Sequence, residues 1–319
     1  MSMQIDLSTN HNFLTPNVNI ELSKIKVNEA TDFTKLYYVI SQHFKINENF
    51  MEIYSGLNNA LYKLIDSFKS NNCYIYSPID TLYTDTLFLK EINVEYINRY
   101  IDLHHDIEAG SIVIFQNPSI PDGSYYDLQA MLDYWSSKQC FIIIDESFLE
   151  FTSYSSVSKY MLNYSNLYIL RSFEYFYNIP AIKATFVISN ENNISKLKQY
   201  NIQHNISPYD NLFIQEMLKD VTFSKISKAT NARSKAYLEK IVQEFSIFQH
   251  TVYSYTNTML IKLNGINAQE LKTILAKFDI LIEDCSKYYF LDSGYVKITA
   301  KSYKDMQSFE KTLNSFISE

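Results

Sequence analysis

A chain of 319 residues, 46% of them hydrophobic, is long enough to form one large α/β domain and a smaller second domain. Its formal charge of −7 argues against nucleic acid as the main partner, because binding phosphates requires a basic surface. No apolar run approaches the ~20 residues of a membrane span. The polar start MSMQIDLSTN does not resemble a signal peptide, so we expect a cytoplasmic protein with no membrane partner.

The three cysteines, Cys73, Cys140 and Cys285, are widely spaced and lie in or beside apolar stretches. We expect them to be buried free thiols in a reducing compartment. Their spacing relative to the six histidines predicts no metal site.

The first 34 residues predict an N-terminal arm. Residues 4–16, QIDLSTNHNFLTP, show no helical period and end at a proline, which favours an extended segment. After an amphipathic helix over 33–44, a short strand over 51–54 leads into Gly56 and a helix. A glycine between a strand and a helix start is typical of an anion site built from unpaired backbone N–H groups, and equally of a simple structural turn.

Buried strands then alternate with helices along the chain. The pattern predicts these strands: 72–77, 111–115, 141–144, 167–170, a short strand end after Phe186, 258–263, 280–285 and 295–298. It predicts these helices: 125–137, 191–199, 210–219, 222–246, 269–277 and 303–317. The alternation indicates an α/β fold, with a mainly parallel sheet covered by helices on both faces in residues 35–205. A smaller α+β C-terminal domain is expected from residues 206–319.

Two of the buried strands end in polar residues. Phe141 to Ile144 is followed by Asp145-Glu146, and Leu167 to Leu170 is followed by Arg171-Ser172. Ligands in open α/β sheets bind beyond the carboxyl ends of the strands. We therefore expect Asp145, Arg171 and Ser172 to face one pocket.

The residues at these strand ends also carry a resemblance. Asp145-Glu146-Ser147-Phe148, Arg171-Ser172-Phe173 and Ile179-Pro180 resemble the central part of the fold-type I pyridoxal-phosphate enzymes. The branch they resemble contains histidinol-phosphate aminotransferase and the threonine-phosphate decarboxylase of cobalamin synthesis. That branch reads Arg-Ser-Phe-Ser/Thr-Lys, and its lysine forms the Schiff base with the cofactor. The lysine position is occupied here by Tyr175, whose phenol cannot form an imine.

The resemblance implies a cofactor, pyridoxal 5′-phosphate, and residues that hold its phosphate. They are the turn Gly56-Leu57-Asn58, which matches the family's Asn-Gly-Ala/Ser-x-Glu, and Ser172. The small third residue of the family's turn is Leu57 here. The family's phosphate-binding arginine corresponds to Lys183, which keeps the positive charge.

The resemblance also implies residues around the cofactor ring. Tyr83 fits the family's Pro-Thr-Phe-x-x-Tyr, whose tyrosine stacks on the pyridine, although a chain with 27 tyrosines can match by chance. Asp145 corresponds to the partner of the pyridinium nitrogen, and the alternative is a buried strand-end carboxylate that is satisfied within the chain. The asparagine that binds the phenolic oxygen corresponds to Ile120, which offers no donor.

For the substrate, the resemblance implies three candidates. Asn10 and Asn12 lie in a run that resembles the family's Asp-Phe-Ser-x-Asn-x-Asn opening, and local Asx-type hydrogen bonding in a loop is the alternative. Lys297 replaces an arginine that binds the substrate carboxylate in a two-pronged grip, which lysine cannot reproduce. Nearby, Glu283 replaces the arginine of the family's Ile-Arg-Asp-Cys-Ser.

Four replacements in one pocket favour an aminotransferase-like protein that is degenerate and cannot form the internal aldimine. Such a protein would act as a binding or regulatory module, or as the partner of an active paralogue. The alternative is an enzyme of amino-acid or cobalamin-type metabolism that binds pyridoxal or pyridoxamine phosphate non-covalently, or another phosphorylated small molecule. A third possibility is that another lysine is the anchor, and Lys183 is the only nearby candidate. The resemblance further implies a homodimer, because two chains build each pocket in that family.

Overall fold

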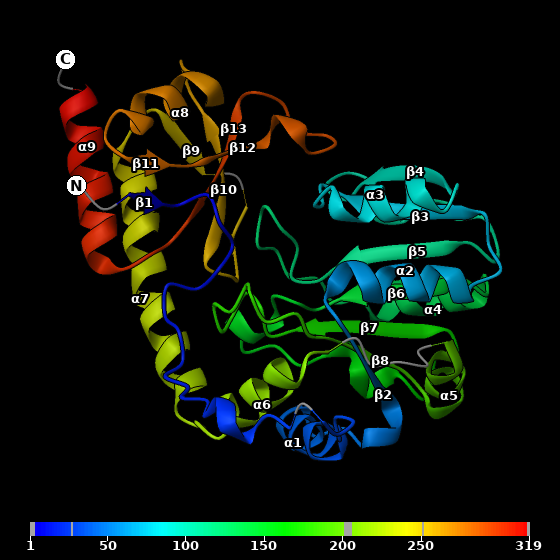
Figure 1. Ribbon diagram of the computed structural model, residues 1–319. Helices are drawn as coiled ribbons and strands as arrows, with labels where there is room; N and C mark the ends of the chain where they lie inside the picture. The colour runs from blue at the N-terminus through cyan, green and yellow to red at the C-terminus, as the bar shows by residue number, and fades with distance from the viewer. Residues whose placement is uncertain (1–3, 27, 201–205, 251, 318–319) are drawn as a thin grey trace.

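The computed structural model describes residues 4–26, 28–200, 206–250 and 252–317. It contains a wide sheet with helices on both sides and, beside it, a smaller sheet with its own helices (Figure 1). The long helix α7 (Phe223–Glu244) connects the two parts: its start packs against the core of the central sheet and its second half against the smaller sheet.

The central sheet has seven strands in the order β2-β8-β7-β6-β5-β3-β4. Their bounds, in that order, are Met51–Tyr54, Thr185–Ile188, Leu167–Ser172, Phe141–Asp145, Ile112–Gln116, Asn72–Ser77 and Asn93–Asn98. The neighbours from β7 to β4 pair in parallel, while β8 runs antiparallel to both β7 and β2. The predicted mainly parallel sheet is therefore confirmed.

Helices cover both faces of this sheet, as predicted. One face packs against α1 (Thr34–Phe44), α4 (Gln129–Ser137) and α6 (Pro208–Met217). The other face packs against α2 (Leu57–Ser67), α3 (Leu82–Leu89) and α5 (Glu191–Tyr200). The strands between these two layers are buried almost throughout, which explains why they appear in the sequence as continuous apolar runs.

The smaller sheet is antiparallel, with the order β12-β13-β10-β9. Its strands are Glu283–Asp284, Tyr295–Thr299, Thr258–Leu263 and Phe248–His250, in that order. A second hydrophobic cluster joins this sheet to α7, α8 (Ala268–Ala276) and α9 (Tyr303–Ile317). Strand β1 (Ile5–Asp6) of the N-terminal arm pairs in parallel with β11 (Ile280–Leu281), so the arm is attached to this smaller part.

Several details differ from the sequence prediction. The expected strand 280–285 is interrupted and forms the two short strands β11 and β12. Residues 206–223 were assigned to the smaller domain, yet α6 and the start of α7 pack against the core of the central sheet. The domain division at residue 206 stays a prediction.

Short 3₁₀ segments complete the described structure: η1 (Leu22–Lys24), η2 (Glu48–Phe50), η3 (Leu149–Phe151), η4 (Val157–Tyr160) and η5 (Cys285–Lys287). All three cysteines are buried and free, as expected. Among the described residues, no helix has the length and apolar character needed to cross a membrane. The cytoplasmic location stays a prediction.

Candidate functional site

Asp145 lies at the end of β6 with its side chain fully buried. Its Oδ1 accepts hydrogen bonds from the Ser147 backbone nitrogen at 2.9 Å and from Ser147 Oγ at 2.5 Å. Its Oδ2 accepts one from Gln116 Nε2 at 3.0 Å and another from the Tyr83 hydroxyl. A carboxylate has about four lone-pair sites, so the chain itself uses all of them.

Tyr83 and Gln116 supply the two hydrogen bonds to Asp145 Oδ2. Tyr83 lies in the first turn of α3, and burial, followed by the negative charge of Asp145, raises its pKa well above the usual range. The hydroxyl therefore keeps its proton and stays a donor. Gln116 was missed from the sequence; it ends β5 directly opposite Asp145 in the parallel ladder. The alternative interpretation of Asp145, a strand-end carboxylate satisfied within the chain, describes this geometry.

Tyr175 lies just beyond β7. Its ring stacks on Phe148 with 4.4 Å between ring centroids and lies 5.1 Å from the ring of His11. Burial, and then the negative charges of Glu174 and Asp145, raise the pKa of the Tyr175 phenol. At neutral pH this position therefore presents a neutral hydroxyl between aromatic rings.

Ile120 is 1% exposed and belongs to the loop that follows β5. Its backbone nitrogen donates to Gln116 Oε1 at 2.9 Å, which fixes the amide that holds Asp145. Asn117, in the same loop, exchanges hydrogen bonds of 2.9 Å with the backbone of Tyr126. The polar groups of this loop are thus used to shape the loop itself.

The residues assigned to the cofactor phosphate meet at the start of α2. Gly56 is the N-cap of α2 with φ of 82°, and a Cβ added there would lie 3.7 Å from Lys183 Cδ. Leu57 is half-buried and Asn58 is exposed in the first turn of the helix. Gly56 and Lys183, to which the resemblance assigns one role, are therefore neighbours.

A carboxylate also lies among these groups. Glu174 Oε1 is 3.5 Å from Lys183 Nζ and 3.6 Å from His11 Nε2. The Glu174 backbone nitrogen donates to Ser172 Oγ at 3.1 Å. Glu174 was not singled out from the sequence, although it replaces the Ser/Thr of the family motif. Its charge opposes a second anion at the same place.

The residues assigned to the substrate carboxylate form an internal ion pair. Lys297, in β13, is 1% exposed; its Nζ pairs with Glu283 and donates to Asn10 Oδ1. Glu283 lies directly opposite Lys297 in the antiparallel β12–β13 ladder. Glu283 Oε1 also pairs with Lys287 Nζ at 2.7 Å and accepts from the Tyr288 hydroxyl at 3.0 Å. Burial alone would raise the pKa of Glu283, but the charge of Lys297 and the bonds from both lysines hold it below its ordinary value.

Asn12 ties the N-terminal arm to the rest of the chain. Its Nδ2 donates to the Phe176 carbonyl at 2.8 Å and to Ser227 Oγ at 2.5 Å. Its Oδ1 accepts from Asn231 Nδ2 at 2.8 Å and from the Leu14 backbone nitrogen at 3.1 Å. The last of these bonds is the local Asx-type bond that the sequence offered as the alternative.

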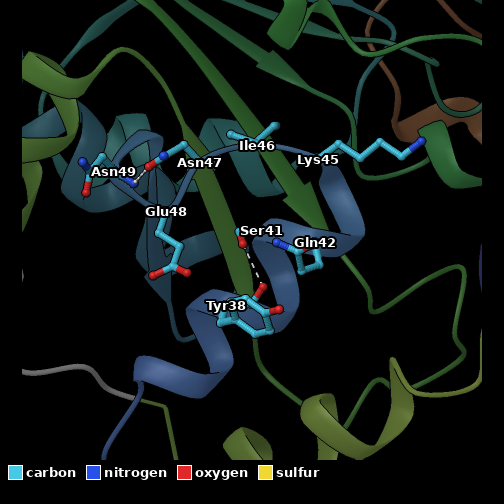
Figure 2. A pocket seen from close by; sticks show the side chains of 8 residues that line it. All are labelled: Tyr38, Ser41, Gln42, Lys45, Ile46, Asn47, Glu48 and Asn49. Carbon is cyan, nitrogen blue, oxygen red and sulfur yellow. Dashed lines mark hydrogen bonds between the residues drawn. The ribbon is translucent and has the colours of Figure 1, made fainter.

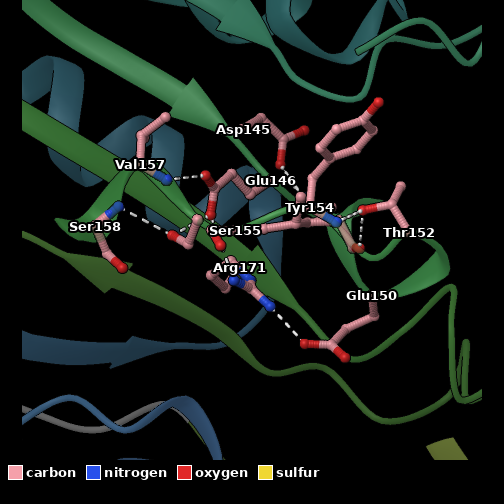
Figure 3. A network of polar contacts seen from close by, with 12 residues as sticks. Asp145, Glu146, Glu150, Thr152, Tyr154, Ser155, Val157, Ser158 and Arg171 are labelled. Atoms are coloured by element: carbon pink, nitrogen blue, oxygen red, sulfur yellow. Dashed lines mark hydrogen bonds and ion pairs between the residues drawn. The ribbon is translucent and has the colours of Figure 1, made fainter. Parts of the chain in front are cut away.

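The prediction that Arg171 faces the same pocket as Asp145 is wrong. Leu170 lies opposite Asp145 in the β6–β7 ladder, and successive side chains alternate across a strand, so Arg171 points to the other face. There its guanidinium pairs with Glu146 Oε2 at 3.3 Å and Glu150 Oε1 at 2.5 Å (Figure 3).

The two carboxyl groups beside Arg171 differ in their titration. Glu146 is fully buried, and burial raises its pKa despite the charge of Arg171. For Glu150 burial acts in the same direction, but the hydrogen bond from His43 and the charge of Arg171 lower its pKa to about 2. This network stabilises the connection after β6 and lies on the opposite side of the sheet from Tyr83.

A surface concavity of about 600 Å³ lies between the end of α1 and η2 (Figure 2). Within it, Ser41 Oγ donates to the Tyr38 carbonyl at 2.8 Å and Asn47 Oδ1 accepts from the Asn49 backbone nitrogen at 2.9 Å. The residues that line it include none of those assigned to cofactor or substrate. In the described part of the chain, no three His, Cys, Asp or Glu side chains are grouped to hold a metal ion.

Comparison with known proteins identifies the family. The family model described as aminotransferase class I and II matches residues 90–314. The chain belongs to the class I and II aminotransferase family. A histidinol-phosphate aminotransferase of Brachyspira hyodysenteriae is 24% identical to this chain, over 98% of this chain and 92% of the length of that protein.

Solved structures of similar proteins show the same fold. The histidinol-phosphate aminotransferase of Clostridium acetobutylicum matches with a TM-score of 0.85 and 22% identity, over 98% of this chain and 99% of that one. The L-threonine-O-3-phosphate decarboxylase of Porphyromonas gingivalis matches with a TM-score of 0.82 and 20% identity, over 99% and 100%. The resemblance found in the sequence motifs is therefore confirmed.

The family is dependent on pyridoxal phosphate, but the donor set of this chain does not fit the covalently bound cofactor. Tyr175 supplies no amine at the position assigned to the lysine, and Ile120 supplies no donor for the phenolic oxygen. Asp145 has no lone pair left for a pyridinium nitrogen. Gly56 and Lys183 are the assigned groups that keep an anion-binding character.

Proposed function

We propose that this member of the class I and II aminotransferase family does not form an internal aldimine and acts as a binding or partner module. The observation that carries the proposal is the saturation of Asp145. Ser147, Gln116 and Tyr83 together donate four hydrogen bonds to its two oxygens. An electron-withdrawing pyridinium requires a carboxylate partner. If a pyridinium nitrogen bound Asp145, it would displace one of the four hydrogen bonds that the chain already makes to this carboxylate.

The carboxylate end of the pocket supports the same proposal. A substrate carboxylate would compete with Glu283, which is held on Lys297 by the register of two paired strands. Glu283 cannot leave freely, because its backbone is part of the ladder and Lys287 and Tyr288 also hold its side chain. A lone external carboxylate has no such support.

A second candidate function rests on the phosphate end. Lys183 keeps 51% of its side-chain surface exposed and stands beside the positive-φ turn at Gly56, whose helix start offers unpaired backbone N–H groups. We propose that a small phosphorylated molecule binds there non-covalently, pyridoxal or pyridoxamine phosphate included. A homodimer, implied by the resemblance, is proposed alongside either function.

Absorbance spectroscopy tests both candidates. The purified protein is mixed with pyridoxal phosphate, reduced with borohydride and digested for peptide mapping, with Lys183→Met as a matched variant. The proposed function predicts that, in the wild-type protein, no lysine of the pocket carries a reduced pyridoxal-phosphate adduct. Spectral changes without an adduct, abolished in Lys183→Met, support the second candidate. A stoichiometric adduct on one lysine would contradict the degenerate assignment.

The dimer is tested separately by light scattering. Two chains per particle at micromolar concentration are expected. A monomer under those conditions would remove the dimer from the proposal while leaving the pocket chemistry to the spectroscopic test.

A further inference from the structure

The sequence contains one Asn-Gly pair, Asn264-Gly265, and one Asp-Gly pair, Asp122-Gly123. In such a pair the backbone nitrogen of the glycine can attack the side-chain carbonyl carbon of the preceding residue and close a five-membered succinimide ring. Glycine favours this reaction, because it has no Cβ to hinder the approach of its own nitrogen. The surroundings of the pair then decide whether the ring can close, and the two pairs differ in their surroundings.

Asn264 and Gly265 lie in the turn that joins β10 to α8, and both residues are exposed. A Cβ added to Gly265 would meet no atom within 4 Å, so the space around its backbone is open. Gly265 has a φ of 72°, which glycine adopts without strain. The backbone of this turn can therefore move without displacing a packed neighbour.

The reacting atoms of the exposed pair have no partners. Within the described chain, the Gly265 backbone nitrogen donates no hydrogen bond and Asn264 Oδ1 accepts none. Asn264 Nδ2 donates to the Ser246 carbonyl at 3.2 Å, but this nitrogen is the leaving group and not the atom attacked. The Asn264 backbone nitrogen donates to the Ile247 carbonyl at 2.9 Å, which holds the start of the turn and leaves the peptide bond to Gly265 free.

The Asp122-Gly123 pair lies in a packed loop. Asp122 is 0% exposed, and its Oδ1 accepts from the Ser119 hydroxyl. The Gly123 nitrogen donates to the Ser119 carbonyl at 2.7 Å, and the Gly123 carbonyl accepts from the Tyr255 nitrogen at 2.7 Å. A Cβ added to Gly123 would collide with Ser254 Oγ. The attacking nitrogen is therefore occupied, and the loop has no room to rearrange.

We infer that Asn264-Gly265 is a site of spontaneous deamidation in the folded protein, and that packing protects Asp122-Gly123 from ring closure. The Gly265 nitrogen forms a bond to Asn264 Cγ, and the Cγ–Nδ2 bond breaks. The proton of the Gly265 nitrogen passes through water to Nδ2, which leaves as ammonia. A water molecule then opens the succinimide at either of its two carbonyl carbons, and the product is aspartate or isoaspartate.

Both products change the turn. A carboxylate at position 264 adds one negative charge to the formal −7 and cannot donate to the Ser246 carbonyl. Isoaspartate also adds one carbon atom to the backbone between β10 and α8. The turn ends where the Ala268 nitrogen donates to the Ser293 carbonyl at 2.7 Å. The isoaspartate form therefore has a longer and more acidic connection to α8.

Peptide mapping by mass spectrometry tests the inference on the full chain. The native protein and the protein unfolded in urea are incubated side by side at mildly alkaline pH, and aspartate plus isoaspartate at position 264 are followed with time. We expect the native rate to lie within about tenfold of the unfolded rate, because opening an exposed turn costs little free energy. A slower native rate, or no reaction in the native protein, would overturn the inference.

The variant Asp122→Asn supplies a matched comparison, because it places a second Asn-Gly pair inside the packed loop. The amide introduced there should react in urea at about the rate of Asn264. In the native variant it should react at least about tenfold more slowly than Asn264, since its reaction requires local opening. A smaller difference between the two native rates would contradict protection by packing.

The variant Asn264→Gln is the control for the position. Attack on its longer side chain would have to close a six-membered ring, so the signal at position 264 should disappear, and a signal that persists would overturn the assignment. Thermal melting shows whether each variant is folded, and if Asp122→Asn is not, the native and urea-unfolded wild type decide alone. The borohydride test is independent, because Asn264 contacts Ser246 and Ile247 and not the pocket of Asp145.

Discussion

The two lysines that stand where the resemblance implies arginines have the same charge but opposite environments. Lys183, at the phosphate end, is half-exposed and lies 3.5 Å from Glu174. Lys297, at the carboxylate end, is 1% exposed and is paired with Glu283 and Asn10. Keeping a positive charge therefore does not keep an anion site, because the chain can supply the anion itself.

The difference between the two ends has an energetic consequence. Exposed ion pairs contribute about 0–1 kcal/mol, since water screens them and long side chains lose entropy. Buried pairs have little net advantage over apolar residues, but removing one partner leaves an uncompensated charge at a cost of ~3–5 kcal/mol. Mutations at Lys297 and its partners should therefore change the stability of the fold. Mutations at Lys183 and its partner should mainly change the affinity for a ligand.

The largest effect is expected from Lys297→Met. Glu283 would lose its partner in the β12–β13 ladder but keep Lys287 and Tyr288. We therefore expect a loss near the lower limit, about 3 kcal/mol, in the free energy of unfolding measured with urea.

Two further variants make this result specific. Lys304→Met, on the exposed side of α9, should change stability by no more than about 0.5 kcal/mol. The double variant Lys297→Met/Glu283→Leu should recover most of the loss, because no charge is left buried alone. A single-variant loss below about 1 kcal/mol would mean that the pair is more hydrated than its burial indicates.

The second prediction concerns acid. Because the folded-state pKa of Glu283 lies below its ordinary 4.5, its ionised form stabilises the fold fully above pH 4.5. This contribution is lost as pH falls through the lowered folded-state value. We expect Glu283→Gln to cost about 3 kcal/mol at neutral pH, the lower limit for a broken buried pair, because the amide still offers an oxygen to the buried Lys297 but not a charge. The difference from the wild type should shrink below pH 4.5.

Urea unfolding of both proteins across acid pH measures this difference. Glu150, whose pKa is about 2, titrates in both proteins, so subtraction leaves the contribution of Glu283. A difference that stays constant down to the lowest pH would show that the Glu283 charge does not stabilise the fold.

The third prediction restores cofactor chemistry step by step. Tyr175→Lys alone should give a weak, slow imine with pyridoxal phosphate, because Ile120 leaves the phenolic oxygen without a donor and Asp145 is saturated. Adding Ile120→Asn should strengthen uptake by ~1.5–3 kcal/mol, about ten- to a hundredfold. Adding Tyr83→Phe should strengthen it again by freeing one lone pair of Asp145.

Titration followed by absorbance and borohydride trapping measures each step. Tyr126→Phe, which leaves the Asp145 bonds intact, is the control for loss of a tyrosine hydroxyl. Full-strength imine formation in Tyr175→Lys alone would mean that neither the missing donor nor the saturated carboxylate limits binding.

How far the fold can be predicted from sequence depends on the element. Strands over 112–116, 141–145 and 167–172 were found because burial on both sides makes them continuous apolar runs. Strand β4 (Asn93–Asn98) was missed, since it is an edge strand with alternating exposure and polar ends. Helix α3 was missed because its polar residues, Thr84, Asp85 and Thr86, are consecutive in LYTDTLFL and give no amphipathic period.

From the sequence, individual replacements could be recognised, but the pairs that these residues form could not. Glu283 and Lys297 were each recognised as replacements, yet their ion pair depends on a register that no local pattern specifies. The same holds for Gln116, which meets Asp145 only because β5 and β6 pair in that register. Arg171 was misplaced for a related reason: alternation fixes which neighbours share a face, but not which residue lies opposite Asp145.

The smallest effect is expected at the phosphate end. Glu174→Ser removes the carboxylate 3.5 Å from Lys183 and places there one of the two residues found in the family motif. Exposed pairs of this kind are worth about 0.2–1 kcal/mol, so affinity for inorganic phosphate should rise by no more than about fivefold. Stability should change little, since Lys183 remains half-exposed and hydrated.

Phosphate titration of the wild type, Glu174→Ser and Glu174→Ser/Lys183→Met measures this effect. If Glu174 pairs with the lysine that a phosphate needs, the rise in phosphate affinity in the single variant must vanish in the double variant, which lacks Lys183. A gain that persists without Lys183 would assign the phosphate to the helix start at Gly56 alone, where backbone N–H groups bind anions without a lysine. If Glu174→Ser does not raise the affinity for phosphate at all, water separates Glu174 from Lys183 in solution. Lys183 and Lys297 would then differ in burial, but not in their ability to bind an external anion.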